Sequence, residues 1–140
     1  MKNTTGSKGY SIIELVIVFS ILSIIAAIAI PSYYRYKNRT YYSQLVQATI
    51  PYRVAIATCA QRLKKLTGCD AGKQGIPVAI TTPKGPIHSL SVAAGVITVT
   101  PVEYKSIVSE DTYILTPVLN KDGKLTWTTS GQAVKHGYAY

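Results

Sequence analysis

The first feature of the chain is an apolar run near its start. Residues 12–30 are hydrophobic or small, apart from Glu14 and two serines. As a helix, these 19 residues span about 29 Å, close to the ~30 Å hydrocarbon core of a membrane. The run therefore predicts a membrane-length helix, which Pro31 ends or kinks.

Beyond Pro31 the hydrophobic positions recur with a helical period. Their alternating spacing of four and three residues predicts one buried helix face. The members of this stripe are Leu45, Thr49, Tyr52, Ile56, Cys59 and Leu63. We expect the helix to continue to residue 66, with a second kink at Pro51 and a stop at the Thr67–Gly68 pair.

The second half of the chain carries loop and strand signals. Glycines and prolines punctuate residues 68–86, which predicts a long loop whose short apolar piece, residues 78–80, docks on the core. Residues 96–100, 112–116 and 124–128 predict strands, with residues 87–92 as a candidate fourth, and the NKDG at residues 120–123 predicts a hairpin. The expected fold is α+β, with a long N-terminal helix packed against a small antiparallel sheet.

Composition narrows the function. The chain has 15 Lys and Arg against 6 Asp and Glu, a net charge of +9, which favours anionic partners. We find no catalytic constellation, so no catalytic residue, enzyme activity or cofactor is predicted. The two cysteines and the distant His88 and His136 lack ligand spacing, so no metal site is expected either. Trp127 is interpreted as a packing residue.

Glu14 is the residue that a plain membrane anchor leaves unexplained. A carboxylate inside a spanning helix costs up to about 3 kcal/mol and usually has a partner. A secretory signal peptide with a cleavage box at residues 27–29 is the other simple interpretation, and it gains nothing from Glu14. A cut between Gly9 and Tyr10 supplies a partner, because the new amine on Tyr10 meets Glu14 of a neighbouring copy in a staggered helix bundle.

These residues carry a resemblance to a known family. The heptapeptide GYSIIEL at residues 9–15, the apolar run and AAIAIPSY at residues 26–33 resemble the prepilin signature of type IV pilins. The similarity covers residues 8–36 closely. The order of long helix, loop and antiparallel sheet also resembles the pilin fold. Two positions depart from the pattern: Tyr10 replaces the usual phenylalanine, and Ser23 stands where a glycine is common.

The resemblance implies a life cycle for the chain. Residues 1–9 are the leader, a prepilin peptidase cuts after Gly9, Tyr10 is N-methylated, and Glu14 directs filament assembly. Residues 10–66 are the long helix, of which 10–31 cross the membrane or line the filament core, and residues 67–140 are the head. The partners implied are other pilin subunits, in a homo-polymer or mixed filament, and the inner membrane before assembly. The final location implied is an extracellular pilus.

Cys59 and Cys69 bracket the expected end of the helix. A disulfide there ties the helix end to the loop in the oxidising compartment outside the membrane. Two free buried thiols are the alternative. Many pilins place their disulfide near the C-terminus, whereas residues 130–140 contain no cysteine.

Cations suggest one further role. Removing Lys2 and Lys8 with the leader leaves 13 Lys and Arg against the same 6 acids, a net charge of +7. A cluster at the helix end and the following loop is our candidate for binding extracellular DNA. Its members are Arg62, Lys64, Lys65 and Lys73.

The resemblance therefore predicts a type IV pilus subunit, with adhesion, twitching motility or DNA uptake as its candidate roles. The first alternative is a pseudopilin of a type II secretion system, which shares the N-terminal features. The second is a single-span membrane protein with a basic binding head, which predicts an intact N-terminus and no polymer.

Overall fold

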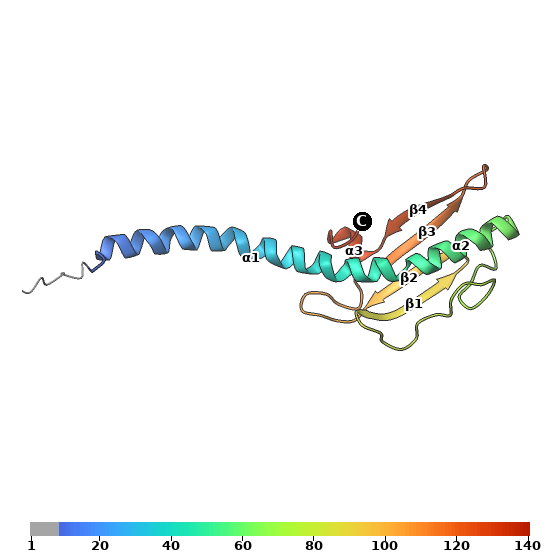
Figure 1. Ribbon diagram of the computed structural model, residues 1–140, viewed down its shortest axis with the longest axis horizontal. Coiled ribbons are helices and arrows are strands. Elements are labelled where there is room, and N and C mark those ends of the chain that lie inside the picture. The colour runs from blue at the N-terminus through green and yellow to red at the C-terminus, as the bar shows by residue number, and fades with distance from the viewer. Residues whose placement is uncertain (1–8) are drawn as a thin grey trace, which may run out of the picture. The chain divides into compact units, whose positions relative to one another are not determined.

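The computed structural model describes residues 9–140, and most of the predicted leader, residues 1–8, lies outside the described part. The chain divides into two compact units, Met1–Tyr36 and Lys37–Tyr140. The helix α1, Ile12–Ala48, begins in the first unit and continues into the second (Figure 1). Each unit is described by itself below.

The two prolines of the long helix behave differently. Helix α1 does not end at Pro31, contrary to one of the two outcomes expected there, because the neighbouring turns keep their hydrogen bonds around the single missing N–H. The predicted interruption at Pro51 is confirmed, since α2, Ile50–Leu63, starts just before it. At the junction Thr49 N–H donates to the Val46 carbonyl at 3.1 Å, a tighter turn than an α-helix makes.

Helix α2 ends three residues before the expected position. Its last residue is Leu63, and Lys64 follows with φ 55°, a left-handed conformation that cannot continue the helix. Sequence patterns favoured residue 66 because the glycine terminator stands at Gly68. The left-handed position is instead taken by a lysine, which carries no such signal.

The sheet confirms the predicted antiparallel meander with its fourth strand. Its strands are β1 (Ile87–Ala93), β2 (Val96–Pro101), β3 (Tyr113–Leu119) and β4 (Leu125–Ser130), in the order β1-β2-β3-β4. A short helix, α3 (Gln132–Lys135), follows β4 and was not predicted. Figure 1 shows α2 and the end of α1 lying across one face of this sheet.

The core of the head lies between that helix face and the sheet. The predicted stripe is confirmed: Leu45, Thr49, Ile56 and Cys59 are inaccessible to solvent, and Tyr52 is nearly so. They pack with sheet residues that alternate along the strands, namely Leu90, Val92, Ile97, Val99, Tyr113 and Leu115. Leu63 lies at the edge and is partly buried, as is Trp127, which packs against the core as expected.

Candidate functional site

The first turn of α1 contains a capping box around Glu14. Ser11 precedes the helix, its N–H donates to Glu14 Oε2 at 2.7 Å, and Ile13 N–H donates to Ser11 Oγ at 3.3 Å. This is the reciprocal S-x-x-E arrangement, which satisfies two backbone donors that a helix start leaves free. The carboxylate also lies at the positive end of the helix dipole. The S-x-x-E spacing was present in the sequence, and our sequence reasoning missed it.

The expected cleavage position is open to solvent. Gly9 and Tyr10 precede the helix, and Tyr10 is 84% exposed. A Cβ added at Gly9 meets no atom within 4 Å. The peptide bond between these two residues is therefore sterically accessible, and the Glu14 carboxylate is bound to the N–H of Ser11, the residue that follows Tyr10.

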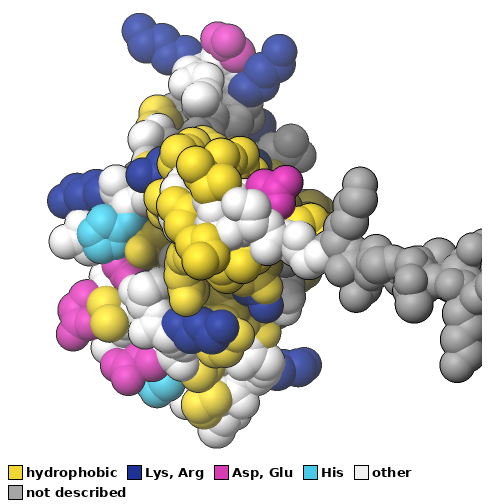
Figure 2. All heavy atoms as spheres, turned by 90° about the vertical axis from the view of Figure 1, so that its left-hand side faces the viewer, with side chains coloured by type: hydrophobic (Ala, Val, Ile, Leu, Met, Phe, Trp, Pro, Cys, Tyr) yellow, Lys and Arg dark blue, Asp and Glu magenta, His cyan; other side chains and the backbone are white. Residues whose placement is uncertain are grey.

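The first unit exposes an apolar surface with its own polar groups satisfied. Every residue from 9 to 37 is exposed, and Figure 2 shows hydrophobic side chains gathered over the helix on the side facing the viewer. The hydroxyls of Ser20 and Ser23 donate to the Val16 and Phe19 carbonyls at 2.8 and 2.7 Å. Within residues 9–140, the continuous stretch Ile12–Leu63 is the one helix long and apolar enough to span a membrane.

Cys59 and Cys69 form a disulfide, which excludes the free-thiol alternative. Both residues are fully buried, and their Cα atoms are 6.0 Å apart. The carbonyl of Cys69 accepts the N–H of Gly95 at 2.9 Å, in the turn between β1 and β2. Gly95 has φ 80°, and a Cβ there would lie 3.0 Å from Leu66. The disulfide therefore links α2 to a segment that is itself bound to the sheet.

The four candidate DNA-binding cations do not share one environment. Lys73 Nζ lies 3.2 Å from Asp70 Oδ2, so it is already paired. The N–H of Ala94 donates to Asp70 Oδ1 at 2.9 Å and, with Lys73, holds the pKa of that carboxyl below its usual value. Arg62, Lys64 and Lys65 are exposed at the end of α2 and make no ion pair within residues 9–140.

Lys64 also lines a cavity that we call the basic notch. It has a volume of about 290 Å³ and lies between the end of α2 and the hairpin joining β3 to β4. The walls are formed by Ala60, Gln61, Lys64, Leu119, Asn120, Lys121 and Gly123. Two ammonium groups and two carboxamides are thus brought together by segments almost 60 residues apart, a proximity that the sequence did not indicate.

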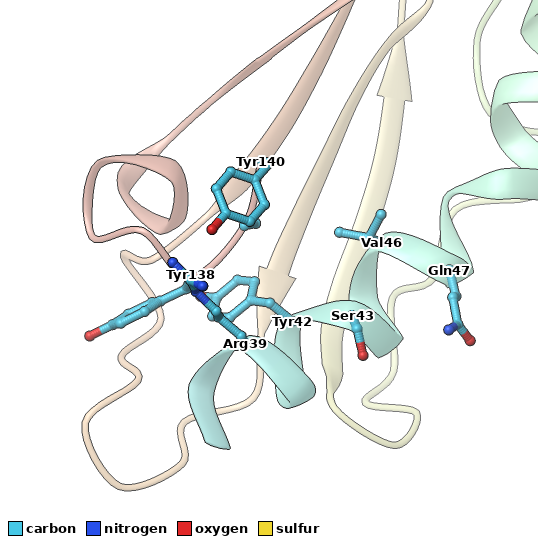
Figure 3. A pocket seen from close by; sticks show the side chains of 8 residues that line it. Arg39, Tyr42, Ser43, Val46, Gln47, Tyr138 and Tyr140 are labelled. Atoms are coloured by element: carbon cyan, nitrogen blue, oxygen red, sulfur yellow. The ribbon is translucent and has the colours of Figure 1, made fainter. Parts of the chain in front are cut away.

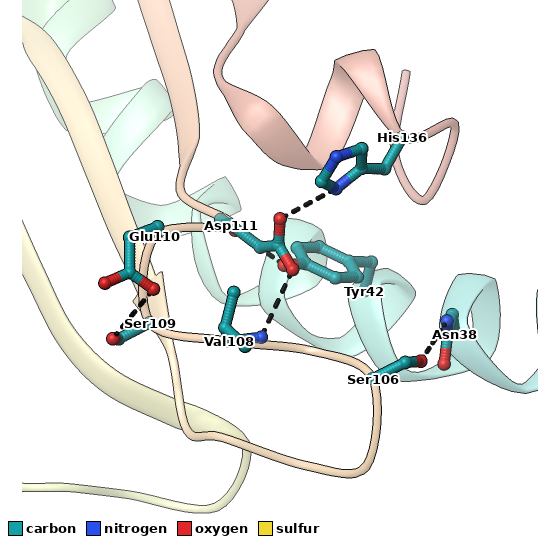
Figure 4. A network of polar contacts seen from close by, with 8 residues as sticks. All are labelled: Asn38, Tyr42, Ser106, Val108, Ser109, Glu110, Asp111 and His136. Atoms are coloured by element: carbon teal, nitrogen blue, oxygen red, sulfur yellow. Dashed lines mark hydrogen bonds and ion pairs between the residues drawn. The ribbon is translucent and has the colours of Figure 1, made fainter.

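A second polar feature is the buried carboxylate of Asp111 (Figure 4). Its side chain is 2% exposed; Oδ1 lies 2.8 Å from His136 Nδ1, and Oδ2 accepts the N–H of Val108 at 3.2 Å. The hydroxyl of Tyr42 donates to the Asp111 carbonyl. From the sequence, His136 was considered as a metal ligand, and its spacing did not support that role. The His136 side chain is half-exposed, and its contact with Asp111 links the C-terminal segment to the loop before β3.

A cavity of about 460 Å³ lies beside that segment (Figure 3). It is lined by Arg39, Tyr42, Ser43, Val46, Gln47 and residues 138–140. Arg39 Nε donates to the Gly137 carbonyl at 3.2 Å, and its guanidinium lies 5.2 Å from the Tyr140 ring centre. The chain end is held against α1 without a cysteine.

Comparisons with known proteins agree with this arrangement. Residues 5–30 match the family model described as the prokaryotic N-terminal methylation motif. The chain is 35% identical over 122 residues to prepilin peptidase-dependent protein D of Escherichia coli (strain K12), covering 86% of this chain and 80% of that protein. It is 45% identical over 65 residues to the type IV major fimbrial protein FimA of Dichelobacter nodosus, covering 46% of this chain and 41% of FimA.

A solved structure supports the same assignment. The solution structure of the major type IV pilin PpdD from enterohemorrhagic Escherichia coli matches with a TM-score of 0.57 and 28% identity, covering 68% of this chain and 69% of that one. The chain therefore belongs to the type IV pilin family, whose members are structural proteins and not enzymes.

Proposed function

We propose that this chain is the precursor of a type IV pilus subunit. A prepilin peptidase removes residues 1–9, Tyr10 is N-methylated, and the subunit waits in the inner membrane before it enters an extracellular filament. The observation that carries the proposal is the exposed Gly9–Tyr10 bond shortly before a capped helix start, which is followed by an apolar stretch whose residues 12–30 are all exposed. The name of the prepilin peptidase-dependent relative from Escherichia coli supports the processing step.

Glu14 is the residue that we assign to filament assembly. In the single chain its carboxylate is held by the Ser11 N–H at 2.7 Å. In a helix bundle the ammonium of a neighbouring Tyr10 gives the Glu14 carboxylate a stronger, charged partner. In apolar surroundings a charge that lacks such a partner is strongly destabilising. The capping box thus stabilises Glu14 before assembly, and the neighbouring amine fixes the register afterwards.

Pilus and pseudopilus subunits share these N-terminal features. Of the two, we favour a pilus because the relatives are a type IV major fimbrial protein, a type IV pilus subunit protein TapA of Aeromonas hydrophila and a major type IV pilin. The single-span membrane protein is the remaining alternative, and it predicts an unprocessed chain.

The processing step is tested by expressing the full chain in membranes with and without a prepilin peptidase. We expect the peptidase to shorten the chain by its first nine residues, measured as intact mass, and to leave a Gly9→Leu variant uncut. A chain that keeps the same mass in the presence of an active peptidase contradicts the proposal.

DNA binding is a second hypothesis, supported by the unpaired cations at the end of α2. The ion pair of Lys73 with Asp70 favours Arg62, Lys64 and Lys65 as the residues involved. Retention of a labelled DNA duplex on filaments at rising salt tests it. We expect Arg62→Glu with Lys65→Glu to weaken retention several-fold, and unchanged retention would remove the hypothesis.

A further inference from the structure

The head carries one close pair of exposed carboxylates, Glu103 and Glu110, which we call the acidic pair. Ser109 Oγ lies 3.3 Å from an oxygen of each. Neither residue forms an ion pair in the described part of the chain. By contrast, Asp70 and Asp111 are paired with Lys73 and His136. The acidic pair is therefore an unusual feature on a chain with a large excess of cations.

The loop between β2 and β3 holds the acidic pair in a defined place. Asn38 Nδ2 donates to Ser106 Oγ at 3.1 Å, and the ring of Tyr104 stacks on Tyr41 with centroids 5.6 Å apart. The hydroxyl of Tyr41 also donates to the Val102 carbonyl at 2.7 Å. These contacts bind the loop to α1. Because the loop that carries the acidic pair is already held in place, binding a partner costs less conformational entropy.

The basic notch lies at the opposite end of the sheet. Strand β3 starts after the loop that bears the acidic pair and ends at the hairpin that bears Lys121. Its seven residues separate the two sites by roughly 20 Å at about 3.3 Å per residue. Figure 1 shows the loop and the hairpin at opposite ends of the strands. Within one head the acidic pair and the notch cannot meet.

We propose that the acidic pair of one copy docks into the basic notch of a second copy. Two carboxylates face two ammonium groups, and the carboxamides of Gln61 and Asn120 offer further donors. Asp122 in the same hairpin is flanked by Lys121 and Lys124, so the end remains cationic. This inference rests on the proposed role as a filament subunit.

The geometry suits a filament. Two different surfaces at opposite ends of a subunit make a heterologous contact, which propagates into an open helical assembly when the rotation does not close a ring. A filament also holds neighbouring heads at high effective concentration, so that a charge contact that is weak between free subunits is formed most of the time. A nucleic acid phosphate is the competing occupant of the notch, and the test below separates the two.

Charge reversal in full-length chains tests the docking. The acid-reversed variant carries Glu103→Lys and Glu110→Lys, and the notch-reversed variant carries Lys64→Glu and Lys121→Glu. Each is expected to lower the filament protein sheared from cells, relative to subunit in membranes, by about tenfold through like-charge contact. The quadruple variant combines both pairs of substitutions and keeps the net charge of the chain. Its yield of sheared filament is expected to recover to within about threefold of that of the unmodified chain.

The matched control is Lys84→Glu with Lys135→Glu. It reverses two exposed cations of the head that do not line the notch, and filament yield should stay near that of the unmodified chain. Docking is overturned if both reversed variants assemble normally or if the combined variant does not recover. It is also overturned if the notch-reversed filament forms normally but loses DNA retention.

A cross-linking measurement separates this inference from the proposed function. Membranes holding isotopically labelled and unlabelled full-length chains are treated with a carbodiimide, which joins adjacent carboxylates and amines. We expect mixed-isotope peptides linking Glu103 or Glu110 to Lys64 or Lys121, and their absence overturns docking. If the links form but no filament is released from cells, the filament role fails and the docking stands.

Discussion

The two halves of the long helix differ in what surrounds them. Residues 12–30 are apolar on nearly all sides and each is exposed, whereas from Asn38 onward one stripe is buried against the sheet. A helix with one apolar stripe needs one partner, and the sheet of the same chain supplies it. A helix that is apolar all round needs an apolar environment on every side, which a membrane or a bundle of copies supplies.

The polar groups of the two halves show the same difference. In the first half, Ser11, Ser20 and Ser23 bond within four residues of themselves. In the head, tyrosine hydroxyls reach carbonyls far along the chain, Tyr52 to Val78 and Tyr42 to Asp111. These hydroxyls are protonated donors at neutral pH, and burial raises the pKa of both still further. The first half is locally satisfied, and the head is tied together over long distances.

The largest effect is expected from removing the charge of Glu14. Glu14→Gln keeps an oxygen for the Ser11 N–H, so the capping box survives, but it cannot pair with a neighbouring amine. We expect sheared filament to fall at least tenfold, an order-of-magnitude estimate for an unmatched buried charge. Ser11→Ala is the control that weakens the cap and keeps the charge. Normal assembly of Glu14→Gln would show that the capping box is the whole role of this residue.

The next effect sharpens the contrast between a buried and an exposed isoleucine. Ile56 is fully buried in the head, and Ile28 is 70% exposed. Ile56→Ala should lower the free energy of unfolding of the head by about 2–5 kcal/mol, because it leaves a cavity. Ile28→Ala should leave it within about 0.5 kcal/mol. Urea unfolding of full-length chains in detergent, followed by Trp127 fluorescence, measures both. Equal losses of unfolding free energy in the two variants would mean that the stability of the head depends on the first half of the helix, and would contradict the contrast.

Removing the disulfide should have a somewhat smaller effect, confined to the head. Cys59→Ser with Cys69→Ser opens a loop of sequence separation 10. By the loop-entropy relation this lowers the free energy of unfolding by about 2–3 kcal/mol. The same urea experiment with and without reductant checks it, since reductant should destabilise the unmodified chain and leave the double variant unchanged. A double variant as stable as the oxidised chain would contradict the expectation.

The smallest effect is expected at Asp70 and depends on pH. Its pKa is lowered by the Ala94 N–H and by Lys73, so its contribution is present above the usual carboxyl pKa. The contribution is lost as pH falls through the lowered value. Asp70→Asn should therefore reduce the melting temperature at pH 7 by a few degrees at most, and the difference should shrink in strong acid. A difference that grows in acid would contradict the assignment.

Much of the fold was predictable because its signals are local. The stripe on α2 is set by helical spacing, and the strands stand out as β-branched runs between turn residues. The end of α2 was not predictable, because Lys64 takes a left-handed conformation that its side chain does not favour. The capping box at Ser11 and Glu14 was readable in the sequence, but the resemblance drew attention to assembly alone.

The other contacts depend on the tertiary fold. Asp111 meets His136 across 25 residues, and Lys64 meets Lys121 at the notch only because α2 lies against the β3–β4 hairpin. Neither pair has a spacing that a sequence pattern could single out. Conversely, the grouping of Lys73 with the other cations was reasonable from the sequence, and its ion pair with Asp70 was visible only in the structure.

The most direct measurement is the intact mass and N-terminal sequence of protein sheared from the cell surface. The account predicts a chain that begins at Tyr10, carries one added methyl group and has lost the two thiol hydrogens of Cys59 and Cys69. That result would establish processing, export and oxidation in one filament-derived sample. A chain that begins at Met1 and is recovered only from membranes would contradict the central claim.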